Sequence, residues 1–224
     1  MEYIFDKQRF RRYVAKSGIL DHNFFKLINS QDISLAKNLL LIFLKEDYIV
    51  AKEFGQYLAY LISRIEDAKI RMLLIENLWD EHGNGIYDDV HFEQYKSLLK
   101  SLGVDAANLS PKKSDFIELH YSVTNENLLN GIALFTYADE FLSMYEFGQI
   151  KKACHAAFGE FDDRYFKSNQ EADIEHTRQL EEALTLIVSN KDVEDSAFCA
   201  VEKAISSRMS FYDDILNKLN QRTL

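Results

Sequence analysis

The segment YFKSNQEADIEH, residues 165–176, has the spacing of an α-helix. Side chains three or four positions apart share one face of a helix, and here that face carries Phe166, Asn169, Asp173, His176 and then Leu180. Three polar residues therefore stand in a row between apolar ones, on the face expected to point into the core. A buried polar group needs a hydrogen-bond partner or a metal ion, so ordinary packing does not explain this row.

Helical spacing extends over almost the whole chain. Apolar residues recur at steps of three and four, and one proline and eight glycines in 224 residues leave few interruptions. The pattern predicts helices over 3–16, 22–30, 33–46, 49–65, 67–82, 88–102, 113–123, 126–158 with a break near Gly148, 160–189 and 192–220. No linker or internal repeat divides them, so we expect a single all-α domain, residues 1–224, built as a bundle of seven or more helices.

Composition and charge exclude several classes of protein. With 47% apolar and 28% charged residues, the sequence is typical of globular proteins. Its formal net charge of −10 disfavours a broad grip on nucleic acid or anionic lipid. The two cysteines, Cys154 and Cys199, form neither a disulfide framework nor a CxxC zinc motif. No uncharged apolar run is long enough to cross a membrane and no secretory leader is recognisable, so we expect a cytoplasmic location.

Three further apolar stripes contain a polar residue. Glu81 ends one stripe, where it either turns towards water or faces the core. His91 begins another, and a hydrogen-bonded core histidine is the alternative to a ligand there. Glu140 lies in mid-helix with apolar neighbours above and below, so it needs a partner, whereas Asp139 beside it is expected to be solvated.

Together the four stripes predict a buried group of carboxylates and imidazoles, namely Glu81, His91, Glu140, Asp173 and His176. Helical bundles hold non-haem iron or manganese with such side chains, projected inward from facing helices. Carboxylate oxygen and neutral imidazole nitrogen suit Fe(II), with positions left open for dioxygen. The alternative is a buried network of salt bridges and hydrogen bonds without a metal.

The same residues resemble the haem-oxygenase-like diiron oxidases and oxygenases, a family that includes CADD-like proteins and is structurally akin to the TenA and PqqC proteins. The resemblance runs from about Glu53 to Leu184. One motif is ENLWDEHGNGIYDDVHFEQYKSLLKSLG, residues 76–103. It is similar to the family's Asn-Leu-x-x-Glu, a glycine-bearing turn, a histidine and a helix that ends in Leu-Gly. By this match Glu81 and His91 fall on metal-ligand positions.

Two later segments complete the resemblance. ALFTYADEFLSMYEFGQIKKA is similar to the helix that supplies a central carboxylate, for which Glu140 is the best counterpart and Glu146 the alternative. YFKSNQEADIEH matches the family's Tyr/Phe-Phe-x-x-His-x3-Asp-x2-His, so Asp173 and His176 carry over as ligands. Asn169 departs from the pattern, because the family has a histidine ligand at this position.

The asparagine amide can offer a metal only its carbonyl oxygen, a weaker donor towards Fe(II) than imidazole nitrogen. We therefore expect the affected iron to bind less tightly. Three possibilities follow: a diiron site with one labile metal, a mononuclear iron site, or a relic without metal. His82 is not expected to compensate, because it is adjacent to Glu81 and neighbouring helical residues point about 100° apart.

The resemblance implies an enzyme. The family binds two Fe(II) ions, uses O2 as co-substrate and oxidises small metabolites such as amino acids, amines or fatty acids, often in biosynthetic pathways. Tyr95 and Tyr137, each one turn from a proposed ligand, are candidates to orient ligands or supply an electron, with packing in the core as the alternative. A homodimer is also implied by the family.

Two other classes of protein stay open. One is a non-enzymatic bundle that binds a small molecule or a partner in the same cavity. The other is a metal-independent enzyme of the TenA or PqqC type, although Cys154 follows no recognisable nucleophile pattern.

Overall fold

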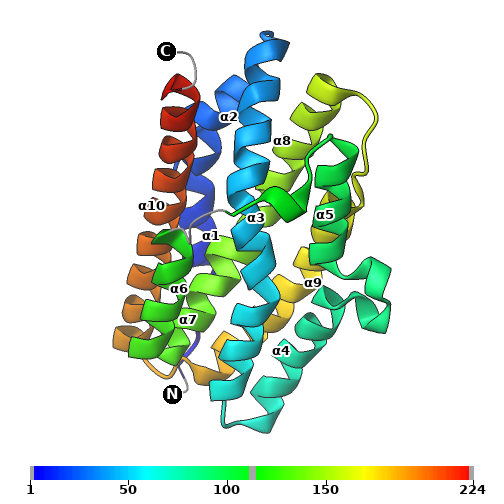
Figure 1. Cartoon of the computed structure of the whole chain (residues 1–224). Helices are drawn as coiled ribbons and strands as arrows, with labels where there is room; N and C mark the ends of the chain where they lie inside the picture. Colours follow the sequence, from blue (N-terminus) through cyan, green and yellow to red (C-terminus); the bar gives the residue numbers. More distant parts are fainter. Residues whose placement is uncertain (1–2, 111–114, 222–224) are drawn as a thin grey trace.

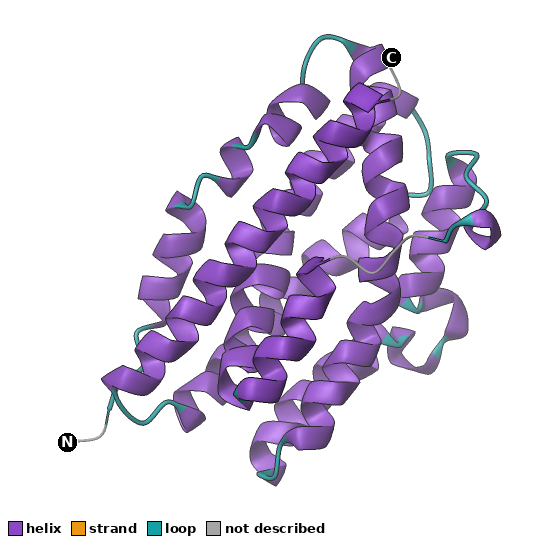
Figure 2. Cartoon of the chain, turned by 60° about the vertical axis from the view of Figure 1, so that its left-hand side comes forward, coloured by secondary structure: helices purple, strands orange, loops and turns teal. Residues whose placement is uncertain are grey.

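α-Helices make up most of the structure, a computed structural model that describes residues 3–110 and 115–221. No strand occurs within those two ranges, as the colours of Figure 2 show. The helices are α1 (Lys7–Lys16), α2 (Asn23–Ile28), α3 (Ile33–Arg64), α4 (Ala68–Glu81), α5 (His91–Ser101), α6 (Asp115–Glu126), α7 (Leu128–Leu134), α8 (Phe141–Phe158), α9 (Arg164–Ile187) and α10 (Lys191–Gln221). A π-helical segment, Phe135–Glu140, joins α7 to α8. The predicted all-α fold is confirmed.

The long helix α3 lies in the middle of the bundle. In Figure 1, α10 and the α6–α7 pair lie on one side of it and α4 and α5 on the other. Helix α8 packs against both α3 and α9. Helix α9 in turn packs against α4, α5 and the π-helical segment. The four elements that carry the predicted ligands therefore meet at α9.

Aspartate and asparagine side chains cap the first turns of several helices. Asp6, Asp32, Asp67 and Asn127 directly precede α1, α3, α4 and α7, and each accepts a hydrogen bond from a backbone N–H of the helix that follows. These N–H groups have no partner inside the helix, so each cap typically contributes about 1 kcal/mol to stability.

Two predicted interruptions are wrong. Helix α3 continues through residues 47 and 48 as one 32-residue helix. A charged residue does not end a helix when a partner meets it in the core, and here Asp47 Oδ1 lies 3.1 Å from Arg208 Nη1. Helix α8 likewise continues through Gly148, and the irregularities of this region lie earlier, at Asn127 and in the π-helical segment. The predicted start of a helix at 113 and 114 lies outside the described residues.

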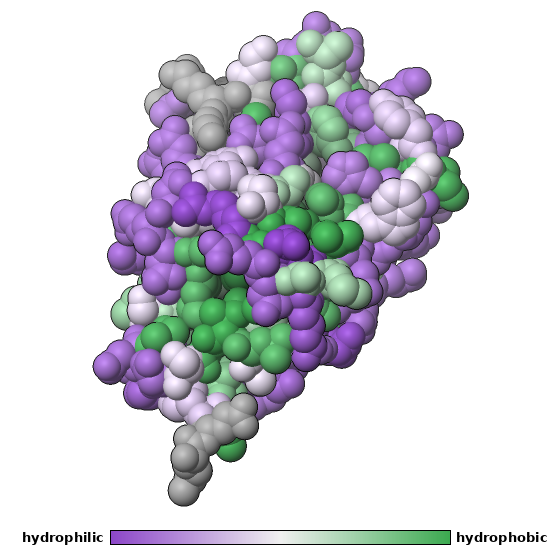
Figure 3. Space-filling model, turned by 90° about the horizontal axis from the view of Figure 1, so that it is seen from below, coloured by the Kyte–Doolittle hydropathy of each residue, from purple (hydrophilic) through white to green (hydrophobic). Residues whose placement is uncertain are grey.

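Apolar side chains fill the space between the helices and also reach the surface. In the core, Tyr212 of α10 stacks on Phe24 of α2 with ring centroids 4.7 Å apart. Seen from below, apolar residues gather in the middle of one face with hydrophilic residues around them (Figure 3). Among the described residues, no helix combines the length and the apolar character that crossing a membrane would require.

Candidate metal centre

The five predicted ligands converge from four elements. Glu81 is the last residue of α4, His91 the first of α5, Glu140 the last of the π-helical segment, and Asp173 and His176 lie about one turn apart on α9. Each of these residues is exposed by 7% or less. Their burial, predicted from the apolar stripes, is confirmed. That they bind a metal stays a prediction.

A tight turn brings His91 back to Glu81. All three residues of the GNG sequence, 83–85, have positive φ, so the chain reverses direction between α4 and α5. At Gly83 an added Cβ would lie 2.6 Å from the backbone carbonyl carbon of Asp89, so only glycine fits there. As a result Glu81 Oε1 lies 3.0 Å from His91 Nδ1.

The π-helical segment turns two neighbouring carboxylates into the core. Its hydrogen bonds skip one residue more than those of an α-helix, which changes the direction of the side chains, and such segments are frequent at functional sites. Asn77 Nδ2 of α4 donates a hydrogen bond of 2.9 Å to Glu140 Oε1. Asp139 Oδ2 lies 2.7 Å from His120 Nε2 of α6. The prediction that Asp139 is solvated is therefore wrong, because it is buried and has an imidazole partner.

Glu81, Glu140 and His176 form the centre of the group. Each offers one ligand atom, and these three atoms lie within 4.8 Å of one another. His176 Nδ1 lies 3.3 Å from Glu140 Oε2, while Nε2 of the same ring lies 3.3 Å from Asp80 Oδ2. Burial alone would lower the pKa of His176, but the carboxylates of Glu140 and Glu81 raise this pKa to about 9. The site therefore favours positive charge.

The residues present fit a bound iron. Within the described structure, the buried Asp173 Oδ2 makes no hydrogen bond, and Glu81 Oε1 and His91 Nδ1 have only each other as a partner at hydrogen-bond distance, 3.0 Å. Buried polar atoms without partners each cost about 1–3 kcal/mol, so a cation that they coordinate would stabilise the site. Three carboxylates and two imidazoles from facing helices are also the donor set that helical bundles use for non-haem iron.

Burial and the neighbouring carboxylates also act on Asp173. Its pKa is raised well above the usual value, first by burial and then by the negative charges of Glu140 and Glu81. Without a metal, a proton on Asp173 relieves the repulsion among the three carboxyl groups, and a bound cation would take the place of that proton.

Asn169 lies one turn before Asp173 on α9, and both residues line a small internal cavity. Its Nδ2 donates a hydrogen bond of 2.7 Å to the carbonyl oxygen of Tyr165 in the preceding turn. The atom left for a cation is thus the amide carbonyl oxygen. The structure therefore brings Asn169 to the group, and the weaker binding that we expect of it stays a prediction.

The two candidate tyrosines lie apart from this cavity. The Tyr95 hydroxyl donates to the carbonyl oxygen of Leu44 at 2.8 Å, and the Tyr137 hydroxyl donates to Glu181 Oε1 at 3.3 Å. Neither ring lines the cavity beside the predicted ligands. Their hydrogen bonds are those of tyrosines packed in the core.

Glu146 and His82, the two other residues considered as ligands, also point away from the group around His176. Glu146 Oε2 lies 3.1 Å from Arg208 Nη2, so Glu140 is the carboxylate that adjoins His176. His82 is exposed, and its Nδ1 lies 2.8 Å from the carbonyl oxygen of Leu78. It therefore turns away from Glu81, as its neighbouring position in the helix predicts.

A narrow internal cavity of about 30 Å³ adjoins the predicted ligands. This is space for about two water molecules. Four of the residues that line it belong to the predicted site, namely Glu81, His91, Asn169 and Asp173. Four others are charged, namely Asp47, Asp139, Glu146 and Arg208, and most of the remaining lining is apolar.

The sequence analysis missed Asp47, Arg208 and His120. Each is a polar residue within an apolar stripe, for example Asp47 after Leu40 and Leu44 on α3. The criterion that identified Glu140 would therefore have identified them as well.

The fold resembles that of two solved structures over nearly its whole length. A domain of unknown function with a heme oxygenase-like fold from Shewanella denitrificans has a TM-score of 0.78 at 18% identity, covering 99% of this chain and 96% of that one. A CADD-like protein of unknown function from Nostoc punctiforme has a TM-score of 0.79 at 14% identity, covering 95% of this chain and 96% of that one. The predicted haem-oxygenase-like fold is confirmed.

Fold and site together define a class: a haem-oxygenase-like helical bundle with buried carboxylates and imidazoles at its centre. Residues 41–207 match the sequence profile of the iron-containing redox enzymes, and the chain belongs to that family. The predicted oxidoreductase class is thereby confirmed.

Curated relatives extend over most of the chain. The 4-aminobenzoate synthase of Chlamydia trachomatis is 26% identical over 212 residues, which cover 91% of this chain and 89% of that protein. The 4-aminobenzoate synthase of Chlamydia muridarum is 28% identical over 211 residues, covering 91% and 86%.

Proposed function

We propose that this protein is a non-haem iron oxidase or oxygenase that activates O2 and oxidises a small metabolite, such as an amino acid, an amine or a fatty-acid-like molecule, in a biosynthetic pathway. The observation that carries the proposal is the convergence of five buried ligand-type side chains from four elements, among which Asp173 Oδ2 has no hydrogen-bond partner.

Glu81, His91, Glu140, Asp173 and His176 are the residues that would hold the iron. Bound Fe(II) supplies the electrons with which O2 is reduced. The protein orients the ligands through partners behind them: Asn77 donates to Glu140 Oε1, and Asp80 faces His176 Nε2. A proton held on Nε2 by Asp80 leaves Nδ1 of the same ring free to face the metal.

We expect two irons per chain, one of them weakly bound because Asn169 replaces a histidine. The side-chain carbonyl oxygen of Asn169 is a neutral metal ligand. Its amide nitrogen already donates a hydrogen bond to the backbone carbonyl oxygen of Tyr165. If the weaker position does not fill at working concentrations of Fe(II), the enzyme acts with a single iron.

A more specific product is supported by the curated relatives. Both are 4-aminobenzoate synthases that match this chain over about nine-tenths of its length. On this ground 4-aminobenzoate is the first product to test.

Two other classes are weighed against the oxidase. A non-enzymatic binding bundle would use the cavity without iron. A metal-independent enzyme of the TenA or PqqC type that uses a thiol would need a reactive cysteine in the cavity. Cys154 is fully buried and burial raises its pKa to about 12, and the exposed Cys199 does not line the cavity.

Oxygen uptake tests the proposal. Protein loaded anaerobically with Fe(II) should consume O2 on mixing and show a transient visible absorbance, and His176→Ala should do neither. O2 uptake by the wild type no faster than by His176→Ala would overturn the oxidase and favour the binding bundle.

Growth of a bacterial strain that cannot make 4-aminobenzoate tests the product. Expression of this chain should restore growth without added 4-aminobenzoate, and His176→Ala should not. No growth together with intact O2 uptake in the purified protein would reject this product and leave the oxidase.

A further inference from the structure

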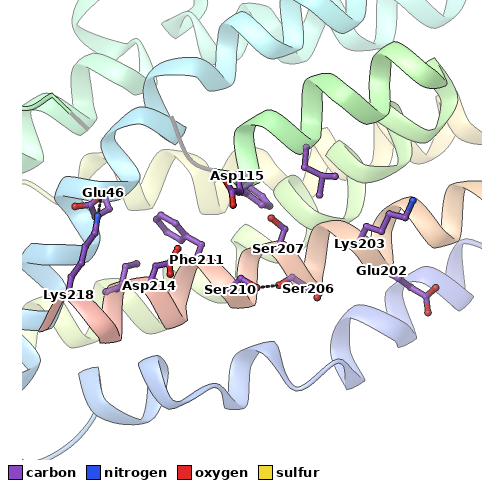
Figure 4. Close-up of a pocket in the computed structure, with 13 residues that line it drawn as sticks. Glu46, Asp115, Glu202, Lys203, Ser206, Ser207, Ser210, Phe211, Asp214 and Lys218 are labelled. Carbon is purple, nitrogen blue, oxygen red and sulfur yellow. Dashed lines mark hydrogen bonds and ion pairs between the residues drawn. The ribbon is translucent and has the colours of Figure 1, made fainter. Parts of the chain in front are cut away.

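A surface groove adjoins the cavity at Phe116, which is not one of the predicted ligands. It runs between α6 and α10 up to the middle of α3 and encloses about 790 Å³ (Figure 4). Serines of α10 and carboxylates of α6 and α10 line its walls, and Lys218 lies 2.6 Å from Glu46 at one end.

One side chain, Phe116, separates the groove from the cavity. It is the residue that lines both spaces among those the structure describes, and it is only 2% exposed. Behind it lies Arg208, whose guanidinium carbon is 5.3 Å from the centre of the Phe116 ring and 5.2 Å from that of Phe211. Phe116 and the Arg208 guanidinium behind it therefore lie between the groove and the cavity.

The groove carries more negative than positive charge. Among the described residues that line it are four carboxylates and two ammonium groups: Glu46, Asp115, Glu202, Asp214, Lys203 and Lys218. In a concave site this excess raises the local concentration of cations and lowers that of anions.

The cavity behind Phe116 has the same excess of negative charge. Away from the predicted ligands, Asp47, Asp139 and Glu146 line it, and Arg208 bridges the first and third of these at 3.1 Å each. His120 faces Asp139 at 2.7 Å. In this part of the cavity three carboxylates thus face one guanidinium.

One buried carboxylate oxygen at this end makes no hydrogen bond. Glu146 Oε1 has no partner with hydrogen-bond geometry, although the hydroxyl of Tyr212 is near. Burial raises the pKa of Glu146 and of Asp47 in spite of the charge of Arg208. Beside Arg208 these two buried carboxyl groups therefore need further positive charge, which a proton on one of them or an organic cation would supply.

Phe116 lines both the groove and the cavity, and both linings carry an excess of carboxylates. We propose on these grounds that the α6–α10 groove is the substrate entrance and that Phe116 is its gate. The substrate is then an organic amine in its ammonium form. The inference deepens the proposed function, on which it rests for what happens to the amine once it reaches the iron.

A rival entrance lies on the opposite side. A depression of about 510 Å³ between α4, α5 and α9 touches the cavity at His91. A substrate that used it would have to pass a predicted metal ligand, whereas the ring of Phe116 contacts His120 and Arg208, neither of which is a predicted ligand. Ala172 lines this depression, so Ala172→Trp is a matched obstruction of the rival route.

Cysteine labelling of the metal-free protein tests the entrance. Ala138 lines the cavity and is 3% exposed, so Ala138→Cys reports on reagents that have reached the interior. Cys199→Ser removes the exposed cysteine, and the remaining Cys154 is buried. The probes are 2-aminoethyl methanethiosulfonate, a cation, and 2-sulfonatoethyl methanethiosulfonate, an anion, with rates expressed relative to those for free cysteine.

The cationic probe should label the Ala138→Cys reporter at least about tenfold faster than the anionic probe. Phe116→Ala and Phe116→Leu should raise the rate for the cation about fivefold or more, because they weaken the closed wall, and Phe116→Trp should lower it. Ser207→Cys in the outer groove should label at the same rate in all Phe116 backgrounds. Circular dichroism and melting curves select variants that remain folded.

Two results would overturn the inference. Labelling that is insensitive to Phe116→Leu and Phe116→Trp but slowed by Ala172→Trp would place the entrance at His91. Equal rates for the two probes would reject an ammonium substrate. The labelling is done without iron, so its result does not depend on iron binding. If the labelling depends on Phe116 and favours the cation but the protein fails to bind iron, the proposed function is overturned and the entrance stands.

Discussion

Glu140 and Glu146 occupy neighbouring turns and are both buried, but their surroundings differ. Glu140 lies beside His176 and accepts a hydrogen bond from Asn77. Glu146 is paired with Arg208. A carboxylate that already neutralises a guanidinium is less available to a metal ion than one that faces an imidazole and other carboxylates.

Glu140→Gln should therefore lower the affinity for Fe(II) by at least about tenfold, because the amide is a neutral and weaker donor. Glu146→Gln should leave Fe(II) affinity unchanged and instead lower the free energy of unfolding, since it weakens the pair with Arg208. Anaerobic Fe(II) titration and urea unfolding of both variants measure the two effects. The opposite assignment, iron lost in Glu146→Gln and retained in Glu140→Gln, would place the central carboxylate at Glu146.

Asn169 is the second residue at which a single substitution is informative. Asn169→His replaces a carbonyl oxygen by an imidazole nitrogen at a position that lines the cavity. We expect the number of irons bound per chain to rise, which metal analysis after anaerobic loading measures. Asn169→Ala is the control. If the histidine variant binds no more iron than the alanine variant, Asn169 is not at a metal position.

At the scale of elements, the metal site depends on the turn between α4 and α5. The backbone of Asp89 and Val90 lies against Gly83, and this contact sets where α5 begins. His91 is the first residue of α5, so its position relative to Glu81 follows from the turn.

Gly83→Ala should lower the free energy of unfolding by about 1–3 kcal/mol more than Gly103→Ala. Both glycines have positive φ, but an added Cβ at Gly103 meets no atom within 4 Å. Thermal melting compares the two, and iron titration should show a loss only in Gly83→Ala. Equal effects of the two substitutions would mean that the contact with Asp89 and Val90 does not hold the turn.

Helix α10 is tied to the start of the chain by Glu194. Its carboxylate accepts hydrogen bonds from the Tyr3 hydroxyl, the Asp6 N–H and Arg9 Nη1, each at 3.0 Å. Burial alone would raise the pKa of Glu194, but these bonds and the one from Lys191 outweigh it and lower the pKa below its usual value.

Glu194→Gln should cost about 1–3 kcal/mol of stability at neutral pH, since hydrogen bonds to a charged group are lost. Because the pKa is lower in the folded state, this stability is present above the unfolded pKa, about 4.3, and is lost as pH falls through the folded value. Denaturant unfolding at several pH values should show the wild type and variant converging in acid. A constant difference from neutral to acid pH would contradict the role of the charge.

At the scale of the whole molecule, the sequence predicted the helical bundle because burial of apolar stripes sets the helices, their faces and the polar intrusions into them. Asp173 and His176 were readable for this reason. The burial of Asp139 could not be predicted in this way. A π-helical segment changes the direction of its side chains, so Asp139 does not follow the three- and four-residue spacing of an α-helical face. Nor does periodicity show which stripes face each other, so the pairing of Asp47 with Arg208 appeared only in the structure.

Iron content of the wild-type protein tests the central claim most directly. After anaerobic loading with Fe(II) and removal of unbound metal, we expect between one and two irons per chain, and His176→Ala should lose most of this iron while it remains folded. Less than about a tenth of an equivalent of iron in the wild type, unchanged in His176→Ala, would contradict an iron site formed by these residues.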